Sequence, residues 1–207
     1  MAFLKNILIL AGLLIAGAFA AEGQSFERQL NAFRNSYLAE SQKDYSTAVA
    51  ALKEVYSESS YELNLRLGWL THLQGNYTES AAYYRKAVSL MPYGLEARFG
   101  LTYPLAKMGN GNELTRLYEQ ILEIDPANTV AMYHYGLLLY NQDNQIKAEK
   151  LLTKVVNLYP FDYDSVVLLG WIKLKLGKSI EAKGLFQKAL LHSPDDESAK
   201  LGLSQIR

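Results

Sequence analysis

The sequence contains no cysteine, only five prolines and no excess of either charge. Without cysteine the chain has no disulfides, no thiolate metal ligands and no cysteine nucleophile. The 21 basic and 21 acidic residues balance, so the chain lacks the positive surface that binds nucleic acid or anionic membranes. Hydrophobic residues make up 49% of the 207 residues, and tyrosine occurs 15 times. This composition is typical of a folded protein and argues against disorder.

Residues 1–20 have the pattern of a signal peptide. Lys5 provides a positive start, residues 7–16 form a short apolar core, and residues 18–20 (Ala-Phe-Ala) present the small side chains that signal peptidase reads. The apolar run is shorter than the roughly 20 residues that span a bilayer. We therefore expect export and cleavage after Ala20, to the periplasm of a Gram-negative bacterium or outside the cell. An uncleaved N-terminal anchor is the alternative.

Proline and glycine recur along the chain at one fixed interval, about 34 residues, which is the signature of a repeat protein. Proline is expected where a helix must stop, and glycine where two helices cross closely enough to exclude a larger side chain. The lattice positions are Pro92, Pro126, Pro160 and Pro194 for proline, and Gly68, Gly136 and Gly170 for glycine.

This period and its residue pattern resemble the tetratricopeptide repeat, a helix–turn–helix unit. The family's small–aromatic–small pattern of the second helix is present as Ala182, Phe186 and Ala189. The resemblance implies an all-α fold, a right-handed α–α superhelix of about five repeats (a TPR solenoid) closed by a short C-terminal capping helix. The expected units are an irregular repeat over 25–60, regular repeats over 61–94, 95–128, 129–162 and 163–196, and the capping helix over 197–207.

Turn and capping residues agree with these boundaries. Asp125, Asp162 and Asp195 stand where an acidic cap or first-turn residue favours the next helix. Polar and glycine-containing segments halfway through the units predict turns between paired helices. These turns are expected at 74–76, 142–144 and 176–178.

The sequence shows no constellation of catalytic or metal-binding residues. The three histidines, His72, His134 and His192, occupy different repeats and different phases of the repeat. The segment 109–111 (Gly-Asn-Gly) lacks the lysine of a phosphate-binding loop. We therefore expect no enzyme activity and no requirement for a cofactor or metal ion.

The resemblance also implies a ligand-binding groove on the concave face. In tetratricopeptide superhelices this groove is lined by the second, fifth, ninth, twelfth and thirteenth residues of each repeat. In this sequence nearly all fifth and ninth positions are aromatic or large and apolar, which predicts a groove for a protein or peptide partner. The candidate residues are Phe33, Tyr37, Leu65, Trp69, His72, Phe99, Tyr103, Lys107, Tyr133, Tyr140, Asn141, Trp171, Leu174 and Lys175.

Other interpretations of this aromatic stripe stay open at the level of sequence. The side chains could pack between repeats, form a self-association surface of a structural subunit, or stack on a carbohydrate. Family members that grip acidic chaperone tails use lysine, asparagine and arginine in this groove, whereas Leu65, Trp69 and Phe99 stand here. The favoured function is a non-catalytic interaction scaffold or adaptor in the cell envelope.

Overall fold

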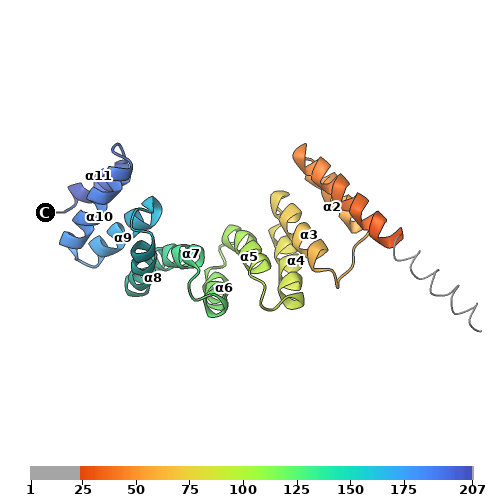
Figure 1. The fold of residues 1–207 in the computed structure, drawn as a ribbon, viewed down its shortest axis with the longest axis horizontal. Coiled ribbons are helices and arrows are strands. Elements are labelled where there is room, and N and C mark those ends of the chain that lie inside the picture. Colours follow the sequence, from red (N-terminus) through yellow and green to blue (C-terminus); the bar gives the residue numbers. More distant parts are fainter. Residues whose placement is uncertain (1–23, 207) are drawn as a thin grey trace, which may run out of the picture. The chain divides into compact units, whose positions relative to one another are not determined.

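The computed structural model describes residues 24–206, which form helices joined by turns (Figure 1). No strand occurs among these residues, and none of their helices is long and apolar enough to cross a membrane. The chain divides into two compact units between Met108 and Gly109. This boundary falls between the two helices of the predicted repeat 95–128. The predicted signal peptide lies outside the described residues.

The first unit consists of successive helices that pack on their neighbours in the chain. Leu63, Leu67 and Leu70 are fully buried and form its core together with Ala48 and Leu52. The third helix of the unit packs on the fourth and also on the fifth. The helices are a helix over 24–41, α2 (Tyr45–Lys53), α3 (Tyr61–Leu73), α4 (Tyr77–Leu90) and α5 (Glu96–Lys107).

The second unit repeats the same arrangement. Each helix packs on the next one in the chain, and α9 also contacts α11. Pairs of long helices followed by a short closing helix confirm the predicted all-α fold. The helices are α6 (Gly111–Ile124), α7 (Thr129–Asn141), α8 (Gln145–Leu158), α9 (Tyr163–Lys175), α10 (Ser179–His192) and α11 (Glu197–Ser204).

Glycine permits the two helices of a pair to approach each other at the predicted crossings. A Cβ atom on Gly68 would lie 2.9 Å from the ring of Tyr84, and one on Gly170 would lie 2.8 Å from the ring of Phe186. A Cβ atom on Gly136 would lie 1.9 Å from the Leu152 side chain. These distances are shorter than van der Waals contact, so the aromatic or leucine side chain occupies the space that a Cβ would need.

The turns between paired helices share one backbone feature. Each has a residue with positive φ shortly after the first helix ends, a conformation in which glycine is least strained. Glycine fills three of these positions, whereas Asp143 and Lys43 adopt φ values of 57° and 61°. The glycines are Gly75, Gly109 and Gly177. Lysine gives no turn signal, so the turn at Lys43 could not be predicted from the sequence.

The helix caps correct two of the three predictions. Asp162 caps α9 as expected, with its carboxylate accepting a hydrogen bond from the Ser165 amide. The cap of α7 is Asn128 and not Asp125. The cap of α11 is Asp196 and not its neighbour Asp195. Both helices begin later in the chain than predicted. An N-cap side chain must stand directly before the first helical turn, because it accepts hydrogen bonds from the free amides of that turn.

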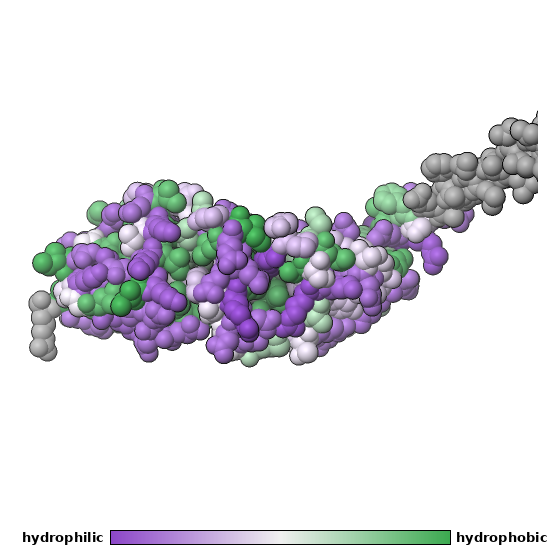
Figure 2. Space-filling model, turned by 90° about the horizontal axis from the view of Figure 1, so that it is seen from below, coloured by the Kyte–Doolittle hydropathy of each residue, from purple (hydrophilic) through white to green (hydrophobic). Residues whose placement is uncertain are grey.

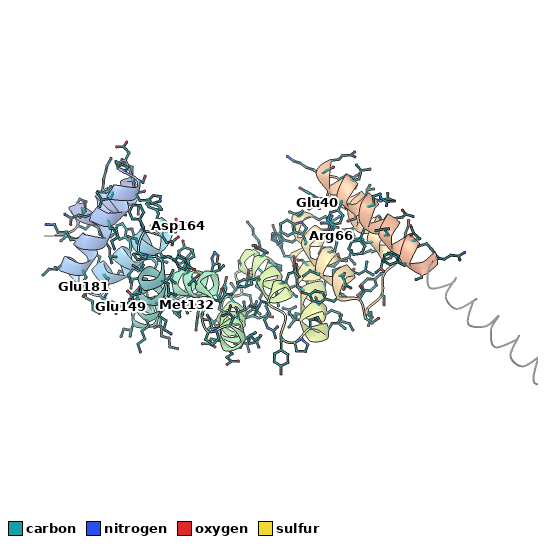
Figure 3. All side chains as sticks on the ribbon, in the orientation of Figure 1. Glu40, Arg66, Met132, Glu149, Asp164 and Glu181 are labelled. Carbon is teal, nitrogen blue, oxygen red and sulfur yellow. The ribbon has the colours of Figure 1, made fainter. Side chains whose placement is uncertain are left out.

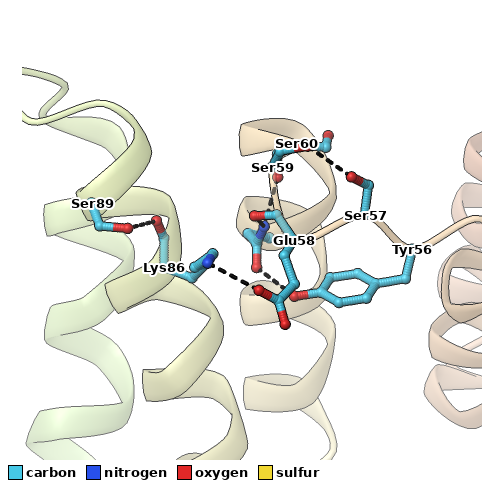
Figure 4. Close-up of polar contacts among 8 residues, drawn as sticks. Tyr56, Ser57, Glu58, Ser59, Ser60, Lys86 and Ser89 are labelled. Atoms are coloured by element: carbon cyan, nitrogen blue, oxygen red, sulfur yellow. Dashed lines mark hydrogen bonds and ion pairs between the residues drawn. The ribbon is translucent and has the colours of Figure 1, made fainter.

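Buried polar side chains occupy equivalent positions of two successive repeats in the first unit. Asn64 is fully buried, and its Nδ2 donates to the carbonyl oxygens of Ser60 and Glu58 at 2.7 and 3.2 Å. Tyr56, which is labelled in Figure 4, donates its hydroxyl hydrogen to Asn64 Oδ1 at 3.1 Å. Arg98, at the equivalent position of the next repeat, donates to the carbonyls four and six residues before it, at 2.8 and 2.6 Å. Both side chains therefore fasten the loop that leads into their own helix.

Gly170→Ala is expected to lower the free energy of unfolding by roughly 1–3 kcal/mol, because its Cβ would overlap the Phe186 ring. Gly184→Ala is the matched control, since no atom lies within 4 Å of its added Cβ in the exposed middle of α10. The control should be stabilised by about 0.5–1 kcal/mol through helix propensity. Urea denaturation followed by circular dichroism measures both. Equal effects of the two substitutions would contradict the close crossing at Gly170.

Candidate functional site

A groove of about 830 Å³ opens on the first unit. Its walls come from the helix over 24–41, α3, α4 and α5. Six of the predicted ligand-binding residues line it together, and we refer to it as the aromatic groove. They are Phe33, Tyr37, Leu65, Trp69, Phe99 and Tyr103.

The rings of this groove contact each other at angles and not as flat stacks. The ring centroids of Trp69 and Tyr103 are 6.1 Å apart with 67° between the planes, an edge-to-face contact. Phe33 and Tyr37 are 6.5 Å apart and tilted by 47°. Tyr37 and Tyr103 are 56% and 52% exposed, whereas Trp69 is half-buried. The two tyrosines therefore offer most of the ring surface that a ligand could contact.

An ion pair between the buried Arg66, which lines the groove, and the half-buried Glu40 joins two helices (Figure 3). Arg66 on α3 lies 2.6 Å from the carboxylate of Glu40 and donates from Nε to Ser36 Oγ at 3.2 Å. Its guanidinium stacks over the Tyr37 ring, 3.9 Å from the centroid. Trp69 Nε1 donates to the other oxygen of Glu40 at 2.7 Å. This network ties the helix over 24–41 to α3 and orients two of the aromatic side chains.

The same network sets the protonation of Glu40. Burial alone would raise the pKa of this carboxyl, but hydrogen bonds from Arg66 and Trp69 and the positive charge of Arg66 outweigh that effect. The net result is a pKa below the ordinary value for glutamate. Glu40 is therefore ionised at neutral pH and neutralises Arg66.

Two further carboxylates line the groove near the N-terminal ends of α3 and α5. Glu62 accepts a hydrogen bond from Ser60 Oγ at 2.9 Å, and Glu96 accepts a long one from the Tyr61 hydroxyl at 3.4 Å. Neither carboxylate forms an ion pair with a lysine or arginine in the described part of the chain. This end of the groove is therefore negatively charged.

His72 and Lys107 lie beside the aromatic groove and do not line it. The His72 ring is surrounded by Trp69, Tyr77 and Tyr103, with centroid distances of 6.0, 5.5 and 5.7 Å. Burial, and then the charge of Lys107, lower the pKa of His72. His72 is therefore neutral at pH 7. Lys107 is exposed at the end of α5.

In the second unit the predicted site residues occupy separate settings. Tyr133 lines a pocket of about 410 Å³ with residues of α8 and α9. The ammonium of Lys175 lies over the Tyr140 ring at 4.3 Å from the centroid. Lys175 also pairs with the exposed carboxylate of Asp143 at 3.2 Å. Asn141 is exposed. Leu174 is half-buried in α9.

Trp171 packs into its own unit. Its ring meets Phe186 edge-on, with centroids 5.2 Å apart, and its Nε1 donates to Ser198 Oγ on α11 at 2.9 Å. The capping helix therefore supplies the acceptor for the indole donor. Part of the Trp171 side chain is therefore used in packing between helices, and the residue is half-buried like Trp69.

The polar members of the aromatic groove were missed at the level of sequence. Glu62 and Glu96 stand at the second position of their repeats, which the family uses for its groove, but neither is among the predicted site residues. Arg66 falls outside the groove positions, and its partner Glu40 belongs to the irregular repeat. The sequence did contain one signal for a partner of Arg66. A charged residue that lies between apolar residues on a buried helix is usually paired with an opposite charge.

The groove shows no sign of a metal site. In residues 24–206, no group of three or more His, Asp or Glu side chains could hold a metal ion. The arrangement offers aromatic surface and negative charge, which suit the binding of another molecule's side chains.

Comparisons with known proteins agree with this architecture. Two family models, both described as tetratricopeptide repeat, match residues 30–94 and 130–162. No curated protein matches the sequence significantly. Given these family matches and the paired helices, the chain is a tetratricopeptide-repeat protein.

Several solved structures share the fold at low sequence identity. A tetratricopeptide repeat protein from Parabacteroides merdae has a TM-score of 0.77 at 19% identity, over 87% of this chain and 72% of that chain. YrrB, described as a TPR protein with an unusual peptide-binding site, has a TM-score of 0.73 at 17% identity, over 90% and 98%. MamA from Desulfovibrio magneticus RS-1 has a TM-score of 0.71 at 20% identity, over 82% and 98%. The tetratricopeptide fold generally binds protein or peptide partners without catalysis.

Glu40→Gln is expected to lower the free energy of unfolding by roughly 1–3 kcal/mol at pH 7, because it leaves the buried Arg66 without its counter-charge. The pKa of Glu40 is lowered in the folded protein. The stabilisation that ionised Glu40 gives the folded state is therefore complete above the ordinary glutamate pKa of about 4.3, and it is lost as the pH falls through the lowered pKa. Urea titrations of wild type and variant between pH 7 and pH 3 measure this difference.

The exposed Glu27 on the same helix provides the control. Glu27→Gln should leave the free energy of unfolding unchanged within about 0.5 kcal/mol at pH 7. A Glu40→Gln effect that stays constant down to pH 3 would contradict the assigned ion pair.

Proposed function

We propose that this chain is a non-catalytic scaffold or adaptor that binds a peptide segment in the aromatic groove. The observation that supports it is the pair of half-exposed tyrosines, Tyr37 and Tyr103, held beside the half-buried Trp69. Aromatic side chains that are already ordered lose little entropy on binding and provide large contact areas. Such residues act as anchors for partner side chains.

The size of the groove favours a peptide segment as the occupant. A volume of about 830 Å³ is similar to that of small-ligand sites and can receive two or three side chains. The likeness to YrrB, which has an unusual peptide-binding site, supports the same class of ligand. The rings of Trp69 and Tyr103 are inclined by 67° and do not form the coplanar platform on which a sugar would stack.

We further propose that the protein works in the cell envelope. This proposal rests on the signal-peptide pattern of residues 1–20 and on the absence of cysteine from the sequence. An adaptor in this compartment would bring together proteins that have themselves been exported. Association with a second copy of the chain is the alternative role of the exposed rings.

Binding through the groove is tested with a phage-displayed random dodecapeptide library selected on the full chain. Peptides enriched on wild type should bind at least about tenfold more weakly to Tyr37→Ala/Tyr103→Ala, because both exposed anchors are removed. Fluorescence anisotropy of the labelled peptides measures the affinity, and circular dichroism checks that the variant is folded. Sedimentation velocity on the same samples reports self-association.

Tyr93→Ala/Tyr159→Ala is the matched control, since these tyrosines are 84% and 56% exposed and lie outside the aromatic groove. The control should bind the enriched peptides with wild-type affinity. Equal binding by all three proteins, or no enrichment on wild type, would overturn the proposed function.

Export is tested by expressing the full chain in a Gram-negative host and sequencing the N-terminus of the product. We expect a periplasmic protein that begins at Ala21, and a chain lacking residues 1–20 that stays in the cytoplasm. Recovery of the uncleaved chain in the membrane fraction would support the anchored alternative. Cytoplasmic recovery of both chains would contradict export.

A further inference from the structure

The aromatic groove has two chemically different ends. Glu62 and Trp69 both line it from α3, two helical turns apart. Glu96 and Tyr103 line it from α5 with the same separation. A helix rises about 1.5 Å per residue, so each carboxylate lies about 10 Å along the helix from its aromatic residue.

The two helices place like residues side by side. The Tyr61 hydroxyl of α3 reaches Glu96 of α5 at 3.4 Å, beside Glu62. Two turns further along, the rings of Trp69 and Tyr103 are in contact at 6.1 Å. The helices therefore run in register, with both carboxylates at one end and both rings at the other.

Residues 24–206 supply no ion-pair partner at the acidic end, although Arg28 lines a neighbouring pocket together with Glu62. Arg66 lines the groove between the two ends, but its charge is matched by Glu40 at 2.6 Å. Glu62 and Glu96 then leave two negative charges on the groove, without a lysine or arginine partner in the described residues. In a concave, partly apolar site such charges act more strongly than on an open surface.

We propose that the groove selects peptide segments with a lysine or arginine at the acidic end and an aromatic or large aliphatic side chain at the ring end. This inference rests on the proposed function and specifies its ligand. An extended peptide advances about 3.3 Å per residue, so about three residues cover the roughly 10 Å between the ends. The basic and the apolar residue are therefore expected two to four positions apart.

The same charges exclude a class of competitor. A peptide with an acidic residue at this spacing would bring a third carboxylate towards Glu62 and Glu96, and the like charges would repel. Selectivity would therefore come both from attraction of the basic side chain and from rejection of the acidic one. Added salt should reduce both effects, because the two glutamates are exposed to solvent.

The enriched dodecapeptides provide the test. We expect a lysine or arginine two to four positions from an aromatic or large aliphatic residue in most peptides whose binding requires Tyr37 and Tyr103. One such peptide is then measured with its basic residue intact and replaced by glutamine, on wild type and on Glu62→Gln/Glu96→Gln. At low salt, each single change should weaken binding about fivefold to tenfold, and the second should add little to the first. Glu123→Gln, an exposed glutamate on α6, is the control for loss of a charge.

The outcomes separate this inference from the function on which it rests. Peptides that need the two tyrosines but carry no basic residue, or that bind both glutamate forms equally, would overturn the charge selectivity and leave the peptide groove standing. The absence of tyrosine-dependent peptides would overturn both. If replacing the basic residue of the peptide and replacing the two glutamates of the protein weaken binding additively, the basic residue contacts other groups. This result would also overturn the assignment to Glu62 and Glu96.

Discussion

Within each unit, the close crossing of paired helices at Gly68, Gly136 and Gly170 is the contact on which the packing depends. Gly68 faces the ring of Tyr84, and Gly170 faces the ring of Phe186, at distances that leave no room for a Cβ atom. Because the helices approach this closely, their apolar side chains form a continuous core with the next helix in each unit. A repeat protein has no other core, so the loss of one crossing affects its neighbours.

The geometry of the aromatic groove follows from this packing in the first unit. The Tyr84 ring lies against both Gly68 and Gly100, and therefore sets the separation of α3 and α5. Because α3 and α5 run in register, Glu62 lies beside Glu96 at one end of the groove and Trp69 beside Tyr103 at the other. The ion pair between Arg66 and Glu40 then attaches the third wall, since the helix over 24–41 contributes Glu40. In Figure 2, hydrophilic residues cover much of the surface drawn, with groups of hydrophobic residues between them.

The predicted groove residues divide into two groups for a physical reason. Phe33, Leu65, Phe99 and their neighbours in the first unit line one cavity. Trp171 occupies an equivalent position in the second unit but packs on Phe186 and donates to Ser198 on the capping helix. Equivalent positions of a periodic sequence are predicted to have the same role. The last repeat, however, is followed by the capping helix α11 and not by another repeat. The end of the array therefore uses its tryptophan for packing.

The class of fold could be predicted without coordinates, because proline, glycine and small residues at an interval of about 34 residues are compatible with few other architectures. The turns at Gly75 and Gly177 could be located in the same way, since glycine relieves a positive φ there. Repeat phase also relates Glu62 to Glu96, which occupy the same position of successive repeats. The partner of Arg66 could not be found by this means, because Glu40 lies on the helix of an irregular repeat that has no fixed phase. Whether a charge in the groove is neutralised or left for a ligand therefore depends on how the helices stack, and local sequence does not encode it.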